Sequence, residues 1–290
     1  MTPWSDKPTP DGCRDCGAFF LDFVGMFSRD AVHVRWSNSK RSTNPQIEQL
    51  IEDAWSKSSR QAENAGRTLF NGKLCRLINC EIQAGTLEMT LGETTYKEVV
   101  GTNFTNAQLR YVHGPEVLAN PLGVSAAVVS NDGYVLLGQR SQKVFLNAGM
   151  IHPVGGTVTP PKTPDQTPSP FDSMTKELTE ELGLNSETIT RNVCLGMVRA
   201  KPIVQPEMVF EVRLNANVGA IRAAATDATD GFEHDELVAI RNDPAAMVTY
   251  IEKNVSQLTP VAMATLLLLG QRHWGMGWFA TARGYLREVI

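Results

Sequence analysis

The chain has 290 residues, of which 42% are hydrophobic and 20% are charged, and its formal net charge at pH 7 is −4. This length suffices for two modest domains or for one elaborated domain with an ample core. The weak negative charge argues against non-specific binding to nucleic acid, and the longest apolar run, 260–270, is too short to span a bilayer. Because Met1 opens no charged and apolar leader, we expect a soluble, cytoplasmic protein.

The cysteines are scattered, and their odd number without a secretory leader argues against a disulfide framework. Cys13 and Cys16 have the C-x-x-C spacing of many zinc sites and redox pairs. Zinc needs four ligands, however, and the remaining three, Cys75, Cys80 and Cys194, supply no second pair at suitable spacing. We therefore expect plain thiols, with zinc or a redox pair as minor alternatives.

The N-terminal part of the chain has the pattern of an α+β region. Its first residues are rich in proline and glycine and indicate irregular structure. The expected elements that follow are a strand at 31–36, a helix at 45–65 and a hairpin of strands at 73–83 and 86–95. Asn44 and Pro45 are suited to begin the helix, and Gly66 is suited to end it. We therefore predict an N-terminal α+β extension over residues 1–115.

The C-terminal part, residues 116–290, has strands before and after one prominent helix. The expected strands lie at 122–130, 134–139, 150–154, 193–199, 208–214 and 237–240, and the expected helices at 169–184, 244–254 and 259–272. A proline-rich segment at 159–170 lies between the third strand and the first helix. This arrangement predicts a second unit of mixed α and β structure.

The stretch 169–184 carries the strongest local signals in the chain. Ser169 is a suitable N-cap, Pro170 fits the first helical position, and Gly183 can end the helix in the left-handed conformation. An apolar stripe is formed by Met174, Leu178 and Leu182, which recur every four residues. The sequence therefore predicts a helix with one buried face.

A second face of this helix carries Glu177, Glu180 and Glu181. Like charges at this spacing destabilise a helix by a few tenths of a kcal/mol per pair, and a cation would offset that cost. Mg²⁺ and Mn²⁺ prefer carboxylate oxygens. The pattern is compatible with a metal site, and its alternative is an acidic face exposed to water.

The segment KELTEELGL at 176–184 resembles the second half of the Nudix box, with Lys176 in place of arginine. Gly155 and Gly156 stand where a glycine opens that box. The first half is irregular, because Lys162 replaces its glutamate and the proline-rich insertion lengthens it. The resemblance implies the fold class α/β (α+β), as a Nudix α/β/α sandwich with an N-terminal α+β extension.

Further patches, in the same order, resemble a divergent branch of the family, the eukaryotic UDP-sugar Nudix hydrolases. They are LFNGK at 69–73, LGETTYK at 91–97, GTN at 101–103, LANPLGV at 118–124 and Arg140-Ser141. That branch has a similar extension and also lacks the first glutamate of the box. The tail after Asp243 has no clear match.

The resemblance implies that Glu177, Glu180 and Glu181 bind Mg²⁺ or Mn²⁺, with the Gly155 carbonyl as a further ligand. It makes Glu181 the first choice for a ligand that also acts as base, with Glu180 as a second catalytic candidate. A base from outside the helix is equally open. These candidates are Glu207, which we rank first, and Glu211, Glu233, Asp235 and Glu236.

The expected substrate contacts come from other segments. Arg140 could pair with a phosphate, Tyr96 could stack on a base, and Asn103 could bond a ribose or uracil edge. Gly156 would let the backbone approach the ligand closely. The structural alternatives are a surface salt bridge for Arg140 and core packing for Tyr96, and we expect His152, near the glycines, to be a packed histidine.

We therefore expect Mg²⁺-dependent hydrolysis of UDP-glucose or UDP-galactose to UMP and sugar 1-phosphate, with a nucleotide sugar as partner and neither nucleic acid nor a membrane. Two alternatives remain open: a Nudix hydrolase of another nucleoside diphosphate derivative, such as ADP-ribose, and a non-catalytic Nudix domain that binds a nucleotide or a protein. The chain has no G-x-G-x-x-G, Walker A or G-x-S-x-G motif, which disfavours dehydrogenases, P-loop kinases and serine hydrolases. The oligomeric state is not indicated.

Overall fold

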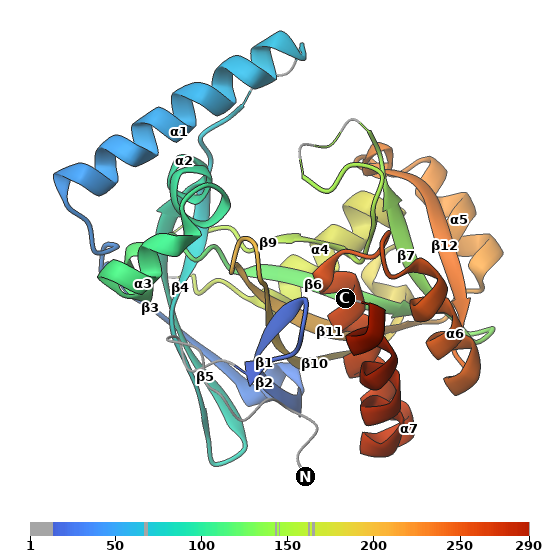
Figure 1. The fold of residues 1–290 in the computed structure, drawn as a ribbon. Coiled ribbons are helices and arrows are strands. Elements are labelled where there is room, and N and C mark those ends of the chain that lie inside the picture. Colours follow the sequence, from blue (N-terminus) through green and yellow to red (C-terminus); the bar gives the residue numbers. More distant parts are fainter. Residues whose placement is uncertain are drawn as a thin grey trace.

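The computed structural model describes residues 14–66, 69–142, 144, 146–161, 163 and 166–289. Cys13 and Lys162, which belong to the C-x-x-C motif and to the first half of the box, lie outside these residues. The described chain folds as two β-sheets with helices packed around them (Figure 1). The predicted mixed α/β class is confirmed.

A large mixed sheet forms the centre of the molecule. Its strands follow the order β1-β2-β10-β11-β6-β7-β12, with β8 paired to β7 and β9 paired to β6. The strands are β1 (Arg14–Asp15), β2 (Phe19–Phe27), β6 (Gly123–Val129), β7 (Tyr134–Arg140), β8 (Ile151–His152), β9 (Val154–Thr157), β10 (Ile189–Ala200), β11 (Pro206–Leu214) and β12 (His234–Arg241). β6 and β11 run parallel, and β6 pairs with β9 in antiparallel register, so that Val124 lies opposite Gly156.

A smaller sheet has the order β3-β5-β4. Its strands are β3 (Val32–Trp36), β4 (Lys73–Gln83) and β5 (Thr86–Thr95). The predicted hairpin is confirmed: β4 and β5 are antiparallel, and Ala84 and Gly85 turn the chain with φ of 49° and 87°. Glycine adopts positive φ without steric cost, which explains why the turn lies there.

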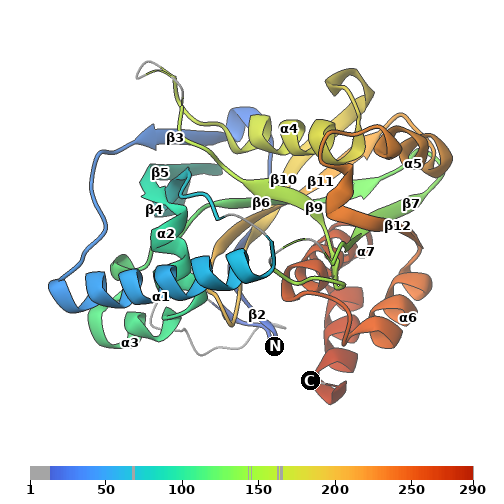
Figure 2. The same cartoon turned by 90° about the horizontal axis from the view of Figure 1, so that it is seen from above.

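The helices described are α1 (Pro45–Asn64), α2 (Tyr96–Val99), α3 (Arg110–His113), α4 (Pro170–Leu182), α5 (Val218–Thr226), α6 (Pro244–Asn254) and α7 (Pro260–Val289). Gly275 interrupts the helical conformation of α7 with φ 82°. Helix α4 covers one face of the large sheet, and α6 and α7 cover the other (Figure 2). The large sheet is therefore the middle layer of an α/β/α sandwich.

Alternation along β6 explains how one strand serves both layers. Val124 and Ala126 face the core under α4, whereas Ala127 and Val129 face the core under α6 and α7. Successive side chains of a strand point to opposite faces, so a strand covered on both faces must be apolar throughout. All seven residues of β6 are buried.

The N-terminal region was only partly anticipated. The proline- and glycine-rich start lies within residues 1–13, outside the described residues, whereas β2, which the sequence did not predict, pairs with β10 inside the large sheet. Side chains of the small sheet, such as Leu87 and Met89, also share a buried cluster with Phe171 of α4. Residues on both sides of the boundary proposed near residue 115 therefore contribute to one buried cluster, and the division into two domains stays a prediction. Helix α5 was also not expected.

Helix α4 has the caps that the sequence indicates. The Ser169 side chain accepts a hydrogen bond from the Asp172 N–H at 3.2 Å, and Gly183 ends the helix in the left-handed conformation with φ 65°. The apolar stripe is buried, and Phe171 packs edge-on against Phe210 of β11 with ring centroids 5.1 Å apart. The helix is thus fixed at both ends and along its buried side.

Within the described ranges, no helix combines the length and the apolar character needed to cross a bilayer. This holds for α7 despite its 30 residues.

Replacing Leu178 with alanine should destabilise the protein by about 2–5 kcal/mol, because the side chain is 1% exposed and its removal leaves a cavity under α4. Urea unfolding followed by circular dichroism would measure the change. The exposed Lys176→Ala is the matched control on the same helix and should change the free energy of unfolding by less than about 1 kcal/mol. Equal effects would contradict the assigned packing of α4.

Candidate active site

A cavity of about 560 Å³ lies where α4, β9, the end of β7 and the start of β11 meet. Its lining brings together most of the residues that the sequence singled out, namely Tyr96, Arg140, His152, Gly155, Gly156, Glu177, Glu180 and Glu207. Asn103 and Glu181 are not part of the lining. The volume lies within the range typical of small-molecule sites.

Glu177 and Gly156 face each other across the gap between α4 and β9. A Cβ atom on residue 156 would overlap the Glu177 carboxylate, so only glycine allows this approach. Burial raises the pKa of Glu177 to about 7, and the negative charges of Glu181, Glu180 and Glu233 add to this effect although Lys176 opposes it. The site thus holds carboxylates that repel one another.

Glu180 lies on the more exposed side of this group. Its carboxylate pairs with Lys176 at 2.5 Å, one helical turn earlier. Its carbonyl accepts a hydrogen bond from the Asp230 N–H at 2.7 Å, which ties the end of α4 to the loop before β12. Lysine at the box position usually taken by arginine therefore neutralises a carboxylate of the site.

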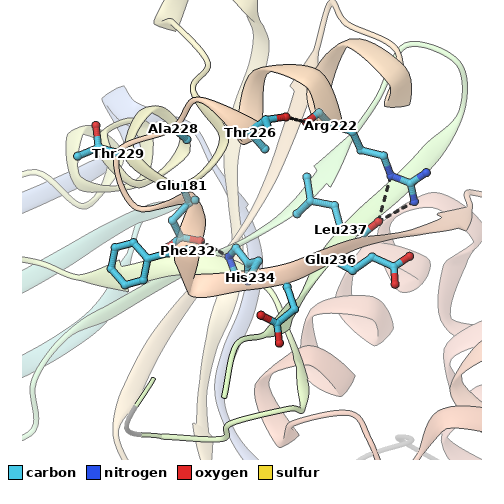
Figure 3. A pocket seen from close by; sticks show the side chains of 12 residues that line it. Glu181, Arg222, Thr226, Ala228, Thr229, Phe232, His234, Glu236 and Leu237 are labelled. Atoms are coloured by element: carbon cyan, nitrogen blue, oxygen red, sulfur yellow. Dashed lines mark hydrogen bonds and ion pairs between the residues drawn. The ribbon is translucent and has the colours of Figure 1, made fainter. Parts of the chain in front are cut away.

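Glu181 is buried and makes two specific contacts. Its Oε1 accepts a hydrogen bond from the Gly155 N–H at 3.3 Å, and its Oε2 lies 2.6 Å from His234 Nε2. Figure 3 shows the Glu181 and His234 side chains facing one another at a second cavity of about 750 Å³ behind α4. Glu181 thus binds the backbone of β9 at Gly155 and does not line the first cavity, where a base would be expected.

His234 was not recognised as a site residue from the sequence. Its ring packs directly over Gly138 of β7, where any side chain would overlap it. The side chain is 4% exposed, so its contact with Glu181 is shielded from water. The available signal was its position three residues before Leu237, the start of the last strand expected from the sequence, but a single histidine without a partner motif did not identify the contact.

Glu207 is the second residue of β11 and is only 7% exposed, so its carboxyl group is buried. The Ser125 hydroxyl of β6 donates a short hydrogen bond to its Oε1. Burial raises the pKa of Glu207 to about 7, although Ser125 and Arg140 act in the opposite direction. A carboxyl group with a pKa near neutrality is suited to proton transfer at physiological pH.

The other candidate bases are spread over three places. Glu233 lines the cavity, and burial together with the charge of Glu181 raises its pKa. Asp235 and Glu236 line the second cavity behind α4. Glu211 is buried elsewhere against Arg213 and His273, and their hydrogen bonds and charges hold its pKa down to about 2 in spite of burial. Of these four residues, Glu233 is therefore the one at the cavity.

Arg140 ends β7 and is largely buried at the cavity wall. Its Nε donates to the Leu146 carbonyl at 3.0 Å, and its Nη2 lies 3.7 Å from Glu233. These contacts fix the guanidinium while leaving it in the lining. This position contradicts the alternative of a surface salt bridge and suits contact with a phosphate.

His152 presents a neutral imidazole to the cavity. Thr259 Oγ1 accepts the Ala262 N–H at 3.1 Å and lies 2.8 Å from His152 Nδ1. The Thr259 hydroxyl has one proton, and His152 Nδ1 is the acceptor within reach of it. Nδ1 therefore accepts this hydrogen bond, and Nε2 carries the proton of the neutral ring. Burial, with the charges of Arg140 and His234, lowers the pKa of His152 to about 3. His152 thus stays neutral across the physiological range.

The two residues expected to contact the nucleoside lie in different environments. Tyr96 lines the cavity and packs edge-on against Trp55 and Phe104, so its ring has partners on the core side and one region facing the cavity. Asn103 is fully buried: its Nδ2 donates to the Ile203 carbonyl at 3.0 Å, and its Oδ1 accepts the Asn120 N–H at 2.9 Å. Asn103 therefore supports the cavity wall at Ile203 from behind.

The oxygen donors of α4 fit a hard divalent cation in their chemistry, and their mutual repulsion, visible in the raised pKa of Glu177, is what a cation would relieve. Across the described part of the chain, no three His, Cys, Asp or Glu side chains already converge as a ligand set.

The Glu207→Gln variant should change how stability depends on pH. Because the folded pKa of Glu207 lies above the ordinary value for glutamate, its contribution is fully present below about pH 4 and is lost as the pH rises through about 7. Between pH 4 and pH 8, the free energy of unfolding of the variant should therefore rise by about 3 kcal/mol relative to that of the wild type. Urea unfolding in chelator would measure this, with the exposed Glu187→Gln as control. The same pH dependence in the wild type and both variants would contradict the assignment.

No protein-family model matches the chain. It is 24% identical to Nudix hydrolase 9 of Arabidopsis thaliana over 86% of this chain and 90% of that protein. It is 29% identical to uridine diphosphate glucose pyrophosphatase NUDT22 of Mus musculus over 60% of this chain, and that alignment spans 64% of the mouse protein. A solved Nudix hydrolase from Nitrosomonas europaea is 14% identical with a TM-score of 0.37, covering 53% of this chain and 89% of that one. Together with the glutamate helix and glycine pair described above, these similarities support placing the chain in the Nudix hydrolase superfamily.

Proposed function

We propose that the protein hydrolyses the pyrophosphate bond of UDP-sugars, such as UDP-glucose and UDP-galactose, to UMP and a sugar 1-phosphate, with Mg²⁺ as cofactor. The observation that carries this proposal is the cavity in which Glu177 and Glu180 of α4, the glycines of β9 and Arg140 line one space. The name of the mouse relative, a uridine diphosphate glucose pyrophosphatase, supports the choice of substrate class.

The carboxylates of Glu177, Glu180 and Glu181, with the Gly155 carbonyl, would hold the cation, and Mn²⁺ would suit the same oxygen donors. A bound Mg²⁺ supplies charge neutralisation at the pyrophosphate oxygens and makes an attacking water more acidic. Arg140 binds a phosphate oxygen from the opposite wall of the cavity. Because Gly156 has no side chain, the diphosphate can lie close to the backbone of β9 and still reach the carboxylates of α4.

Proton transfer is assigned to Glu207 in this proposal. It lines the cavity, is held by Ser125, and has a pKa of about 7, so its carboxylate can accept a proton from water near neutral pH. Glu181, our first choice for the base from the sequence, is kept as a metal ligand but not as the base, because its carboxylate already binds the Gly155 N–H and His234. Tyr96 lines the same cavity and offers its aromatic ring to the uracil base.

The decisive measurement is UMP release from UDP-glucose with and without Mg²⁺. The wild type should form UMP only with the cation, and Glu181→Gln should reduce the rate by orders of magnitude because it weakens the carboxylate cluster and the link to β9. The exposed Glu187→Gln should retain the wild-type rate. Cleavage of ADP-ribose but not of UDP-glucose would replace the substrate class, and nucleotide binding without turnover of either would support a non-catalytic domain.

A second variant tests the geometry of the glycine pair. Gly156→Ala should lower the rate about a hundredfold, because the added methyl group displaces the Glu177 carboxylate and a shift of about 1 Å at a reacting centre has an effect of that size. Gly277→Ala in α7 is the matched control, since its Cβ meets no atom within 4 Å. A fully active, folded Gly156→Ala would show that Glu177 need not lie so close to β9.

A further inference from the structure

A third cavity, of about 650 Å³, lies between β2, β4 and the segment that leads into β6. It shares no lining residue with the candidate active site. The proposed hydrolysis therefore makes no use of it. Its most unusual lining group is the guanidinium of Arg76 on β4.

Arg76 is a buried cation that forms no direct ion pair with a carboxylate of the described residues. The residue is 4% exposed, and its Nη2 donates to the Glu116 carbonyl at 2.9 Å. Its Nε is shielded from water and has no hydrogen-bond partner, and no carboxylate of the described residues forms an ion pair with it. Burying a charge without a partner costs several kcal/mol, which makes such groups uncommon outside binding sites.

The nearby charges do not satisfy Arg76. Asp22, the carboxylate on β2 that lines the same cavity, is taken by Arg199, whose Nε lies 3.2 and 2.9 Å from its two oxygens. Burial and the positive charge of Arg41 lower the pKa of Arg76, and the negative charges of Glu98 and Glu116 partly offset this effect. Asp22 is therefore already paired, and Glu116, the other acidic residue of the lining, is exposed and forms no ion pair with Arg76 among the described residues.

An acceptor without a donor lies in the same cavity. The side chain of Asn120 donates through Nδ2 to the Pro115 carbonyl at 3.2 Å, while its buried Oδ1 has no partner. Apolar surface from Phe23, Leu77 and Ile82 completes the lining. A ligand that matches the cavity carries an anionic group for Arg76, a hydrogen-bond donor for Asn120 and a small apolar or ring portion for the apolar surface.

We propose that this cavity binds a small phosphate monoester, with the phosphate at Arg76 and a hydroxyl or amide group of the ligand donating to Asn120. Guanidinium groups match phosphate oxygens in both charge and geometry. Sugar phosphates and nucleoside monophosphates belong to this chemical class. The proposal does not depend on the proposed function, because it concerns binding in a separate cavity.

Thermal unfolding without metal tests the proposal. Inorganic phosphate, UMP and glucose 1-phosphate, each compared with chloride at equal ionic strength, should raise the Tm of the wild type and of Arg140→Gln, in which the other cavity loses its cation. The Tm of Arg76→Met should not respond, and that of Arg76→Lys should respond less than the wild type. No response of the wild type to any probe, an equal response in Arg76→Met, or a response lost in Arg140→Gln alone would overturn the proposal.

A measurement on the unmodified protein covers the case in which Arg76→Met does not fold. Titration of ¹⁵N-labelled wild type with glucose 1-phosphate should shift the amide signals of Asn79 and Asn120, which line this cavity. Shifts confined to Gly155, Gly156 and Thr157 would assign the binding to the candidate active site and would refute a second site. Neither experiment requires turnover, so their failure is distinguishable from failure of the proposed hydrolysis.

Discussion

The site depends on one close approach, that of the acidic face of α4 to the backbone of β9. At residue 156 the Glu177 carboxylate occupies the space where a Cβ would lie, and at residue 155 the backbone N–H donates to Glu181. The first of these contacts requires α4 to lie closer to β9 than a side chain at residue 156 would allow. The resulting burial, together with neighbouring carboxylates, is what raises the pKa of Glu177.

The remainder of the fold keeps that approach rigid. Helix α4 is capped at both ends, and its apolar stripe packs on residues of β6 and β11 that belong to one buried cluster. On the other side of Glu181, His234 lies against Gly138, so β12 and β7 fix the second partner of this carboxylate. The acidic face of α4 is therefore positioned by the packing of its apolar stripe on β6 and β11 and by the contact of Glu181 with His234. Buried polar contacts of this kind are sensitive to loss of either partner.

Sequence patterns predicted those parts whose signals are local. The caps and stripe of α4, the hairpin of β4 and β5, and the helix Pro244–Asn254 all follow from residues within one or two turns of each other. Strand β2 was missed because its run FFLDFVGMF follows a proline-rich start and lacks alternation, which is what burial on both faces of a sheet produces. The contacts Ser125–Glu207 and Glu181–His234 join residues 82 and 53 positions apart, and only the fold determines such pairs.

The charge balance of the cavity links its two expected ligands. Among the described lining residues, Arg140 is the only arginine or lysine, while Glu177, Glu180, Glu207, Asp230 and Glu233 are acidic and His152 is neutral. A diphosphate entering alone would meet net repulsion, because a single guanidinium does not balance several carboxylates. The raised pKa values of Glu177 and Glu207 lessen that repulsion by protonation, and a divalent cation would remove more of it. The diphosphate alone is repelled by the carboxylates, and a cation would reduce that repulsion. This arrangement of charges therefore favours binding of the two together over binding of the diphosphate alone.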